Sequence, residues 1–455
     1  MFRQKNGVRI GLLLALALVI ALAACAPKAT PTPKPPEAKP TTVPPTAVPP
    51  TAVPTKPPPA PIKIGCSFPL TGASAELGLA SLNGQKLAVK IINGDYPDLD
   101  PLPLAKGIGL PNLGGALIEL VVADNKGVPE TALSEEERLI TQEKIIASMG
   151  GFFSSCSATA SEVAERYGIP ILVGASTSPS LHVRGFKWFF RVGPHDKIFA
   201  ENQLQFLAEL RDKQGLQIKT LVLIHEDTLF GTDSANAQEA LASKYGFEVL
   251  ANIQYARNSP DLSSEILKAK AVNPDVIMPT SYSADAILLQ KTMKDLDLNP
   301  KVVLAQDSGY NLPQFLESLG KDAEYIMSRE VYSSDLGVKV PLLNKVGAMY
   351  LADNGKALFG DPAREFFAMI VMADAINRAG STDPAAIRQA LLATNLGPEQ
   401  MMMPWAGVQF DPANGQNMKA RGIMVQVQDG KYRTVWPFDV AQVAAKVPMP
   451  KWSER

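Results

Sequence analysis

The sequence is poor in the residues that build metal sites and catalytic clusters. Among its 455 residues are three cysteines and three histidines. His182, His195 and His225 form no metal-binding pair, and the sequence has no Gly-x-Ser-x-Gly elbow and no Gly-x-x-x-x-Gly-Lys phosphate loop. We therefore expect no metal, no cofactor and no enzyme activity.

Charge of one sign is not in excess either. Lys and Arg number 44 against 45 Asp and Glu, so the formal net charge is -1, and no basic stripe is visible. Proteins that bind nucleic acid carry a basic face, so we expect no nucleic-acid partner. After residue 25 no apolar run reaches roughly 20 residues, the length that a membrane-spanning helix needs. The rest of the chain is therefore expected to be soluble.

One apolar run does occur at the start of the chain. It covers residues 8–21, has basic residues in and before it, and is followed by Leu-Ala-Ala at 22–24 and then Cys25. This arrangement is typical of an export signal. It resembles the lipobox of bacterial lipoproteins, which implies a signal peptide over 1–25, a lipid on Cys25 and a protein anchored outside the cytoplasmic membrane, on the cell surface or in the periplasm. The alternative is an uncleaved signal anchor that ends in a buried thiol.

Proline is concentrated in residues 26–61, which consist largely of Pro, Thr, Ala, Val and Lys. Proline fixes φ and lacks a backbone donor, so neither sheet nor helix is expected there. The segment is predicted to be an extended polyproline-like stalk, or alternatively a disordered spacer, that holds a globular body away from the membrane.

Two cysteines remain in the globular part of the chain. Cys66 lies in a strand-like run, and Cys156 follows the end of another. Two interpretations stay open for them. One is a disulfide formed in an oxidising compartment, and the other is a pair of small buried apolar side chains.

From residue 61 the chain alternates short strand-like runs with amphipathic helical stretches. The predicted strands cover residues 61–68, 116–123, 147–153, 169–173, 219–225, 247–255, 276–279 and 301–305. The predicted helices cover residues 82–92, 128–147, 157–167, 233–245, 262–271, 284–296 and 366–379. This alternation predicts an α/β fold with parallel sheets covered by helices on both faces. Three later runs predict antiparallel strands, and residues 94–115 predict a surface insertion.

Short landmarks along this pattern carry a family resemblance. They recur in a fixed order: Ile64-Gly65, Pro69-Leu70-Thr71-Gly72, Gly78, Asn93, Asp124, Gly150, Ser154-Ser155, Gly168-Ile169-Pro170, Ala175-Ser176-Thr177-Ser178-Pro179, Phe190-Arg191, Phe230-Gly231, Pro274-Asp275, Phe410-Asp411 and Asp429-Gly430-Lys431-Tyr432. With these landmarks, residues 62 to about 437 resemble the type I periplasmic solute-binding proteins of ABC transporters, in the leucine/isoleucine/valine-binding, branched-chain amino acid family.

The resemblance implies a two-lobed fold and a function. Each lobe would be a parallel sheet flanked by helices, and three hinge crossovers would let the lobes close on a ligand. Carried over, the first lobe covers residues 62–195 and 331–400, the second covers 196–330 and 401–440, and a C-terminal tail covers 441–455. The implied function is capture of a branched-chain amino acid or a similar small zwitterion for an ABC importer, with permease and ATPase subunits as partners.

The first lobe is implied to supply one half of the ligand site. Ser154 and Ser155 come between a strand and a helix, where a hydroxyl and free helix amides bind an anion. The resemblance implies that Ser154 contacts the ligand carboxylate, and that the loop Ala175, Ser176 and Thr177 contacts the amino and carboxylate groups. Without the resemblance, the same residues fit a plain helix N-cap and a Ser/Thr turn.

The second lobe is implied to supply the other half. Asp307 follows a predicted strand and matches an acid that pairs with the ligand ammonium, although the family often has Glu there. Phe230 matches an aromatic position where leucine-binding members have Tyr, and Tyr282 follows another strand. Leu77, near the first turn, is a candidate for the side-chain pocket. The alternatives are a solvated acid at Asp307 and core packing for the aromatic residues.

Two other functions stay open. A surface-anchored hydrolase would use Ser154 as its nucleophile, but the local pattern supplies no base. His225 ends a predicted strand, where the sequence favours a capping or solvated role. Within the binding class, a sensory or uptake lipoprotein would bind amides, urea or aromatic acids, as members of this superfamily do.

Overall fold

The computed structural model describes residues 29–34 and 58–455. Residues 29–34 are exposed and contain neither helix nor strand. Cys25, the predicted signal peptide and the remainder of the Pro-rich linker up to residue 57 lie outside the described residues. The lipid anchor and the stalk therefore stay predictions.

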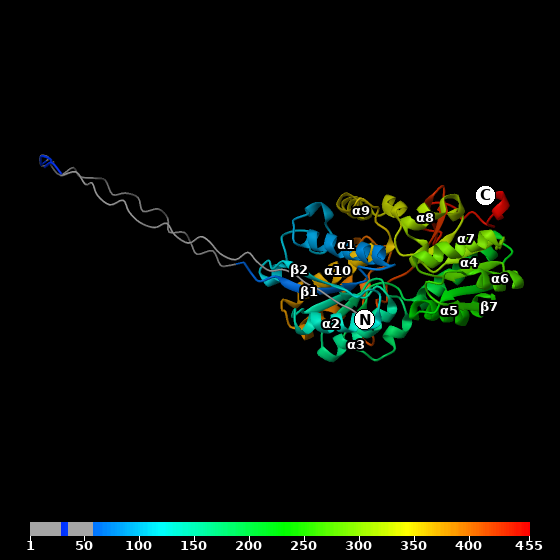
Figure 1. The fold of residues 1–455 in the computed structure, drawn as a ribbon, viewed down its shortest axis with the longest axis horizontal. Helices are drawn as coiled ribbons and strands as arrows, with labels where there is room; N and C mark the ends of the chain where they lie inside the picture. The colour runs from blue at the N-terminus through cyan, green and yellow to red at the C-terminus, as the bar shows by residue number, and fades with distance from the viewer. Residues whose placement is uncertain (1–28, 35–57) are drawn as a thin grey trace, which may run out of the picture. The chain divides into compact units, whose positions relative to one another are not determined.

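The first lobe is built on a parallel sheet. Within residues 58–455 this sheet has five strands, in the order β2-β1-β3-β4-β5. The strands are β1 (Ile62–Phe68), β2 (Ile118–Asp124), β3 (Ala147–Gly150), β4 (Ile171–Val173) and β5 (Phe189–Arg191). The helices of this lobe are α1 (Ala75–Ile92), α2 (Pro129–Thr141), α3 (Ser154–Tyr167), α9 (Pro341–Asn354), α10 (Gly360–Ala379) and α11 (Pro384–Leu392). α1 packs on α10 and α2 on α3, which covers both faces of the sheet (Figure 1).

The second lobe is built on a mixed sheet. Within the same residues it has seven strands, in the order β14-β13-β10-β9-β8-β6-β7. They are β6 (Thr220–Glu226), β7 (Glu248–Tyr255), β8 (Val276–Thr280), β9 (Val302–Ala305), β10 (Met327–Glu330), β13 (Ile423–Gln428) and β14 (Lys431–Trp436). The helices are α4 (Asp196–Gln214), α5 (Leu229–Ala242), α6 (Ser263–Val272), α7 (Ser283–Asp295) and α8 (Pro313–Leu319). β6 to β10 run parallel, and β13 and β14 add an antiparallel edge. The predicted α/β class is confirmed.

The chain passes between the two sheets three times: after β5, after β10 and before β13. Before the last crossing, the short ladder of β11 (Asn395–Leu396) and β12 (Val408–Gln409) leads to Phe410. The Phe410 ring packs on Phe190 of β5, with centroids 5.4 Å apart, and Gln416 forms a bridge with Arg191. These contacts hold residues 408–417 against the first lobe. The lobe boundaries stay a proposal. The last boundary was predicted at residue 401, and from these contacts we place it between residues 417 and 423.

The junction between β3 and α3 differs from the prediction. We expected a strand to residue 153 and a helix from residue 157, but β3 ends at Gly150 and α3 begins at Ser154. Gly150, Gly151 and Phe152 have φ values of 109°, 94° and 49°. Backbone with positive φ cannot continue a strand. The turn therefore comes early, and Ser154 is brought to the start of the helix.

Residues 94–115 are not simply a surface insertion. They form two 3₁₀ turns, η1 (Pro97–Leu99) and η2 (Pro111–Leu113). Leu99, Leu102 and Leu110 are at most 3% exposed and belong to the same apolar core as α1 and α10. The prediction of a surface segment was therefore wrong for these leucines. Their side chains pack into the core, since burial there removes apolar area from water. The helix predicted to residue 147 was also too long, since α2 ends at Thr141.

Cys66 and Cys156 are both free and buried. The interpretation without a disulfide is therefore confirmed. Burial raises the pKa of each thiol to about 12, so both remain protonated at neutral pH. They act as small apolar side chains in a shared core cluster.

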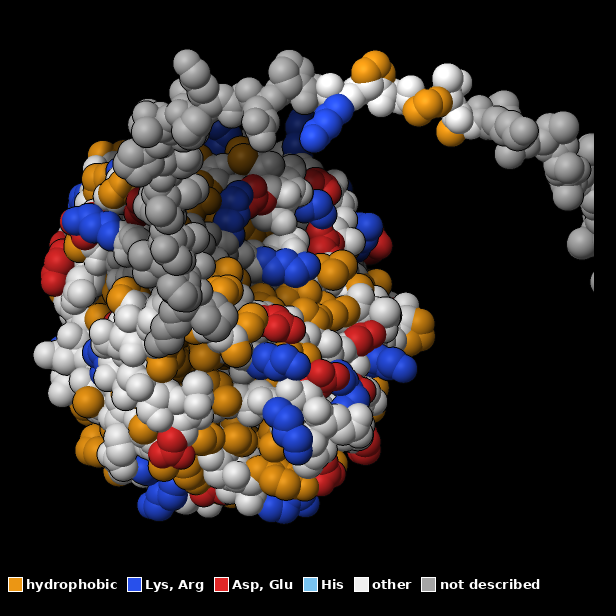
Figure 2. Space-filling view, turned by 90° about the vertical axis from the view of Figure 1, so that its left-hand side faces the viewer, with side chains coloured by type: hydrophobic (Ala, Val, Ile, Leu, Met, Phe, Trp, Pro, Cys, Tyr) orange, Lys and Arg blue, Asp and Glu red, His pale blue; other side chains and the backbone are white. Residues whose placement is uncertain are grey.

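The surface mixes charges of both signs. On the face drawn in Figure 2, acidic and basic side chains are interspersed. Ion pairs also join neighbouring elements, as in the Lys90–Asp353 and Lys356–Glu76 pairs, each 2.7 Å long. Within residues 29–34 and 58–455, no helix is both long enough and apolar enough to cross a membrane.

Candidate ligand-binding cleft

A small cavity lies where the two lobes meet. Its walls are contributed by loops at the carboxyl ends of strands in both sheets and by the start of α10. They comprise Phe152, Ser154, Ala175, Thr177, Phe230, Tyr282, Asp307, Ser308, Arg329, Asp361 and Arg364. Ligands of open α/β sheets bind at this edge, because the loops that follow parallel strands converge there.

Six of the residues that we predicted from the sequence line this cavity: Ser154, Ala175, Thr177, Phe230, Tyr282 and Asp307. Ser155, Ser176 and Leu77 do not. Ser176 Oγ donates to the Phe152 carbonyl at 3.0 Å, so it stabilises the turn behind the cavity. Leu77 is fully buried in the apolar core. The ligand contacts of all nine residues stay predictions.

The first-lobe wall offers hydroxyls and backbone amides. Ser154 is the first residue of α3 and Phe153 is the N-cap, so the plain serine N-cap does not form. Ser154 Oγ accepts a hydrogen bond from the Ser178 amide at 3.3 Å, which joins α3 to the loop that carries Thr177. The first amides of a helix have no partner within the helix. Together with the hydroxyls of Ser154 and Thr177, they can bind a carboxylate without a cationic side chain.

Aromatic rings form a second wall. The ring of Tyr282 lies 5.4 Å from Phe230 and 6.3 Å from Phe152, centroid to centroid. Phe152 comes from the first lobe and the other two from the second, so this wall exists only while the lobes are together. At Gly231 a Cβ atom would lie 2.1 Å from the Glu226 carbonyl oxygen, so only glycine lets α5 start close enough to place Phe230 here.

Buried charges form the third wall. Asp307 Oδ2 accepts from Arg364 Nη2 at 3.0 Å and also from Arg329 Nη1. Arg364 Nη2 donates to Asp361 as well. These four side chains are at most 2% exposed. Asp307 is therefore not a solvated acid, and its charge is already offset by two guanidinium groups.

This charged wall still has open hydrogen-bonding capacity. Nε and Nη1 of Arg364 and Oδ2 of Asp361 are buried and have no partner within the described residues. Burial raises the pKa of Asp361 to about 6, although Arg364 opposes this. Burial lowers the pKa of the Arg364 guanidinium, but Asp361 and Asp307 outweigh that effect and raise it. The wall thus presents hydrogen-bond donors on Arg364 and an acceptor oxygen on Asp361 to a ligand.

Several lining residues were missed by the sequence prediction. Arg329, Asp361 and Arg364 reach the cavity from β10 and α10, far along the chain from the predicted loops. One signal for them was available. The helix from residue 360 is apolar, yet it begins with Asp361, Arg364 and Glu365, and ionisable groups in such a helix are costly unless they are paired.

The cavity is nearly filled by the side chains around it. The space open to the centres of water molecules is about 10 Å³, which is room for roughly one water. Direct contacts join the two sides, since Arg257 Nη2 donates to Ser74 Oγ at 3.3 Å and Ser178 Oγ donates to Asp233. A ligand of amino-acid size can therefore enter only if the lobes separate.

Comparison with curated proteins gives relatives along most of the chain. Leu/Ile/Val-binding protein homolog 7 of Brucella abortus (strain 2308) is 28% identical over 404 residues, covering 86% of this chain and 95% of that protein. Leu/Ile/Val-binding protein homolog 8 of the same strain is 26% identical over 397 residues, covering 84% and 92%.

Solved structures share the fold. The leucine binding protein LivK from Thermotoga maritima has a TM-score of 0.70 at 22% identity, covering 83% of this chain and 99% of that one. LivJ from Streptococcus pneumoniae in complex with isoleucine has a TM-score of 0.67 at 21% identity, covering 86% and 100%. At this identity the likeness establishes the two-lobed architecture alone.

A family model settles the membership of the chain. The model described as periplasmic binding protein matches residues 61–431, which include the first sheet, the second sheet up to the start of β14, the three crossings and the cleft. The family resemblance drawn from the sequence landmarks is confirmed. The chain belongs to the periplasmic binding protein family.

Proposed function

We propose that this protein is the extracytoplasmic solute-binding component of an ABC importer, and that it captures a branched-chain amino acid or a similar small zwitterion. The observation that carries the proposal is the cleft, where hydroxyls and helix amides of the first lobe face aromatic rings of the second. The names of the Brucella relatives and of LivJ, which was solved with isoleucine, support an amino acid as the ligand class.

Each part of a zwitterion has a candidate partner in the cleft. The carboxylate would meet Ser154, Thr177 and the first amides of α3. The ammonium would meet Asp307, or the open Oδ2 of Asp361, which has no competing partner within the described residues. The apolar side chain would pack on Phe152, Phe230 and Tyr282.

Closure of the lobes would retain the ligand. A ligand that touches both walls binds the closed state better than the open state, so it shifts the population toward closure. The contacts between Arg257 and Ser74 and between Ser178 and Asp233 would form in the same step. A lipid on Cys25 would keep the closed receptor near its permease and ATPase partners, and the linker would give it reach.

A binding function fits the cleft better than catalysis does. Ser154 Oγ accepts from a backbone amide, and the lining residues include no histidine. His225 lies elsewhere, with its Nδ1 at 2.9 Å from the Glu226 carbonyl oxygen. A serine without a neighbouring base is a weak nucleophile. An esterase and amidase panel on the full chain is expected to give no turnover.

A thermal-shift screen tests the proposal. A ligand that binds only the native state raises the melting temperature by mass action. We expect leucine, isoleucine or valine to raise it in a concentration-dependent way, and D-leucine, with the same composition but the opposite hand, to have a smaller effect. No shift with any amino acid would contradict the proposed ligand class.

One observation favours a second candidate ligand. The unpartnered Nε and Nη1 of Arg364 lie beside an aromatic wall, and this combination suits an aromatic acid. Benzoate and 4-hydroxybenzoate therefore belong in the same screen, together with urea and acetamide. A shift by the aromatic acids and none by amino acids would select this alternative.

A further inference from the structure

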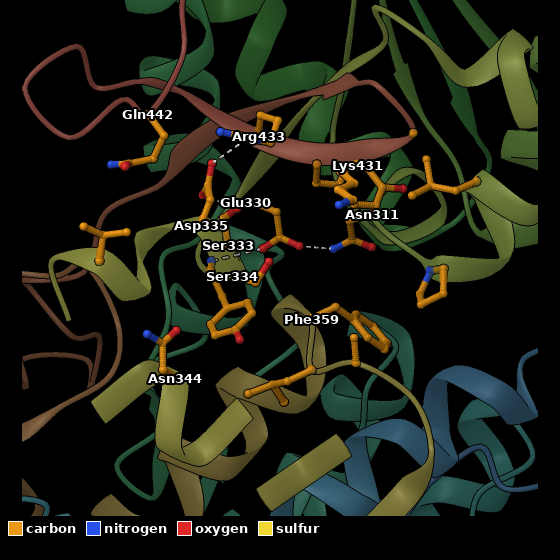
Figure 3. A pocket seen from close by; sticks show the side chains of 18 residues that line it. Asn311, Glu330, Ser333, Ser334, Asp335, Asn344, Phe359, Lys431, Arg433 and Gln442 are labelled. Carbon is orange, nitrogen blue, oxygen red and sulfur yellow. Dashed lines mark hydrogen bonds and ion pairs between the residues drawn. The ribbon is translucent and has the colours of Figure 1, made fainter. Parts of the chain in front are cut away.

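A larger cavity lies beside the cleft and has no role in the function proposed above. Its volume is about 510 Å³, within the usual range of small-molecule sites of roughly 300–1,000 Å³. Figure 3 shows its surroundings. They are β10, the 3₁₀ turn η7 (Ser334–Val338), residues 357–359 before α10 and the β13–β14 hairpin.

Glu330 and Asn311 form its floor. Figure 3 shows the two side chains pointing toward each other near the centre of the pocket. They are only 3% and 2% exposed. Glu330 Oε2 accepts from the Val331 amide at 2.7 Å and from the Tyr332 amide at 3.3 Å, and Oε1 accepts from Asn311 Nδ2. The carboxylate is thereby fixed in place.

With Glu330 ionised, this floor presents acceptors and no free donor. Asn311 Nδ2 donates to Asp307 as well as to Glu330, so both of its hydrogens are used. Both partners are carboxylates, which need a donor. The side-chain amide of Asn311 therefore cannot be flipped to put Oδ1 in the place of Nδ2. Asn311 Oδ1 is buried and has no partner within the described residues. An occupant of the cavity must therefore bring hydrogen-bond donors to the floor.

The walls suit an apolar body that carries a positive charge. Tyr332, Leu358, Phe359 and Tyr432 line the cavity above the floor. Aromatic faces attract ammonium groups, and the effect is larger away from water. Burial raises the pKa of Glu330 to about 8, so a cation beside it would favour the ionised carboxylate. At the rim, Arg433 is paired with Asp335 at 3.5 Å, so its charge is offset there.

We propose that this cavity is a second binding site, for a small organic ammonium ion with an apolar or aromatic body. The ammonium group sits on Glu330 Oε1 and Asn311 Oδ1, and the body packs against Tyr332, Phe359 and Tyr432. Asn311 bonds to both Glu330 and Asp307, so one side chain separates this site from the cleft. The proposal does not depend on which solute the cleft binds.

Calorimetric titration of the full chain with benzylammonium chloride tests this site. Benzoate carries the opposite charge on a similar ring, and benzyl alcohol carries none. We expect benzylammonium to bind in this cavity and the other two probes to bind there far more weakly. Glu330→Gln keeps the shape of the side chain and should weaken binding by about tenfold or more, since a charged hydrogen bond is lost.

Two further variants locate the site. Ala357 lines the cavity and is exposed, so Ala357→Trp should block the cavity without disturbing the core and should abolish benzylammonium binding. Glu317→Gln removes an exposed carboxylate on α8 outside the cavity and should leave the affinity unchanged. No benzylammonium binding by the wild type, benzoate binding that Ala357→Trp abolishes, or wild-type benzylammonium affinity in Ala357→Trp would each overturn the proposal. Circular dichroism of each variant confirms that the fold is retained.

Discussion

At the residue scale, the decisive feature is the number of ionisable side chains buried between the lobes. Sequence position placed Asp307 after a strand, the family resemblance implied that it belongs to the ligand site, and in the structure it lines the cleft. The sequence did not reveal that Arg329 and Arg364 already hold Asp307, because all three come from different elements. Such pairings depend on tertiary packing, which a local pattern does not record.

The first prediction concerns Asp307. Replacing it by Asn would leave two buried guanidinium groups with one acceptor charge fewer, so Asp307→Asn should lower the free energy of unfolding by about 3–5 kcal/mol. Denaturant titration measures this loss. Asp295→Asn, at an exposed acid on α7, is the matched control and should change stability by roughly 0.5 kcal/mol or less. Equal stability of the two variants would show that Asp307 is not part of a buried ion cluster.

The second prediction concerns Glu365, which accepts from the Ala175 amide at 2.9 Å and so supports the ligand loop. Burial raises the pKa of Glu365 to about 7. The native state then keeps a proton that the unfolded state loses between about pH 4.5 and 7. Stability from this group is therefore full below pH 4.5 and is lost as the pH rises to 7, by up to about 3 kcal/mol.

Glu365→Gln removes this pH dependence. Gln85 donates to Glu365 at 2.8 Å and has an unpartnered Oε1, so its amide can turn to accept from the new side chain. Measured by denaturant titration, the variant should gain stability relative to the wild type between pH 5 and pH 8. A difference between the two proteins that is the same at both pH values would mean that Glu365 ionises normally.

At the element scale, periodicity predicts many of the strands and helices in their order, but it missed β5, β10, α4, α8, α9 and α11. It was weakest where backbone conformation decides the boundary, as at Gly150–Phe152, whose positive φ values move the start of α3 to Ser154. It also missed the burial of Leu99 and Leu102, because an irregular segment has no period from which burial can be inferred.

The third prediction concerns the contact between α1 and α10. A Cβ at Gly84 of α1 would lie 2.2 Å from the Pro362 carbonyl oxygen, which is backbone and cannot give way easily. Gly84→Ala should destabilise the protein by about 1–3 kcal/mol, despite the better helix propensity of alanine. Gly347→Ala on α9 is the control. Its nearest neighbour is the Tyr332 hydroxyl at 3.3 Å, so it should be neutral or slightly stabilising. Midpoints of chemical denaturation compare the two, and a stabilised Gly84→Ala would contradict the tight packing.

At the scale of the whole molecule, two sheets are joined by three crossings and share one cleft. The alternation of strands and helices predicts the sheets, but it cannot tell which strands belong together after the chain has crossed. That pairing came from the family resemblance; the match over residues 61–431 confirms the family, and the lobe boundaries stay a proposal. Tyr332, which lies in the second crossing just after β10, also lines the cavity that we assign to an organic ammonium ion.

The central claim is that one solute is held by groups from both lobes at once. Calorimetric affinity for leucine, measured on the wild type, Thr177→Ala of the first lobe and Phe230→Ala of the second, tests it most directly. We predict that each substitution weakens binding by about tenfold to a hundredfold, while Phe438→Ala, at a partly exposed ring outside the cleft, leaves it unchanged. Wild-type affinity in both cleft variants, with leucine still bound, would contradict the claim.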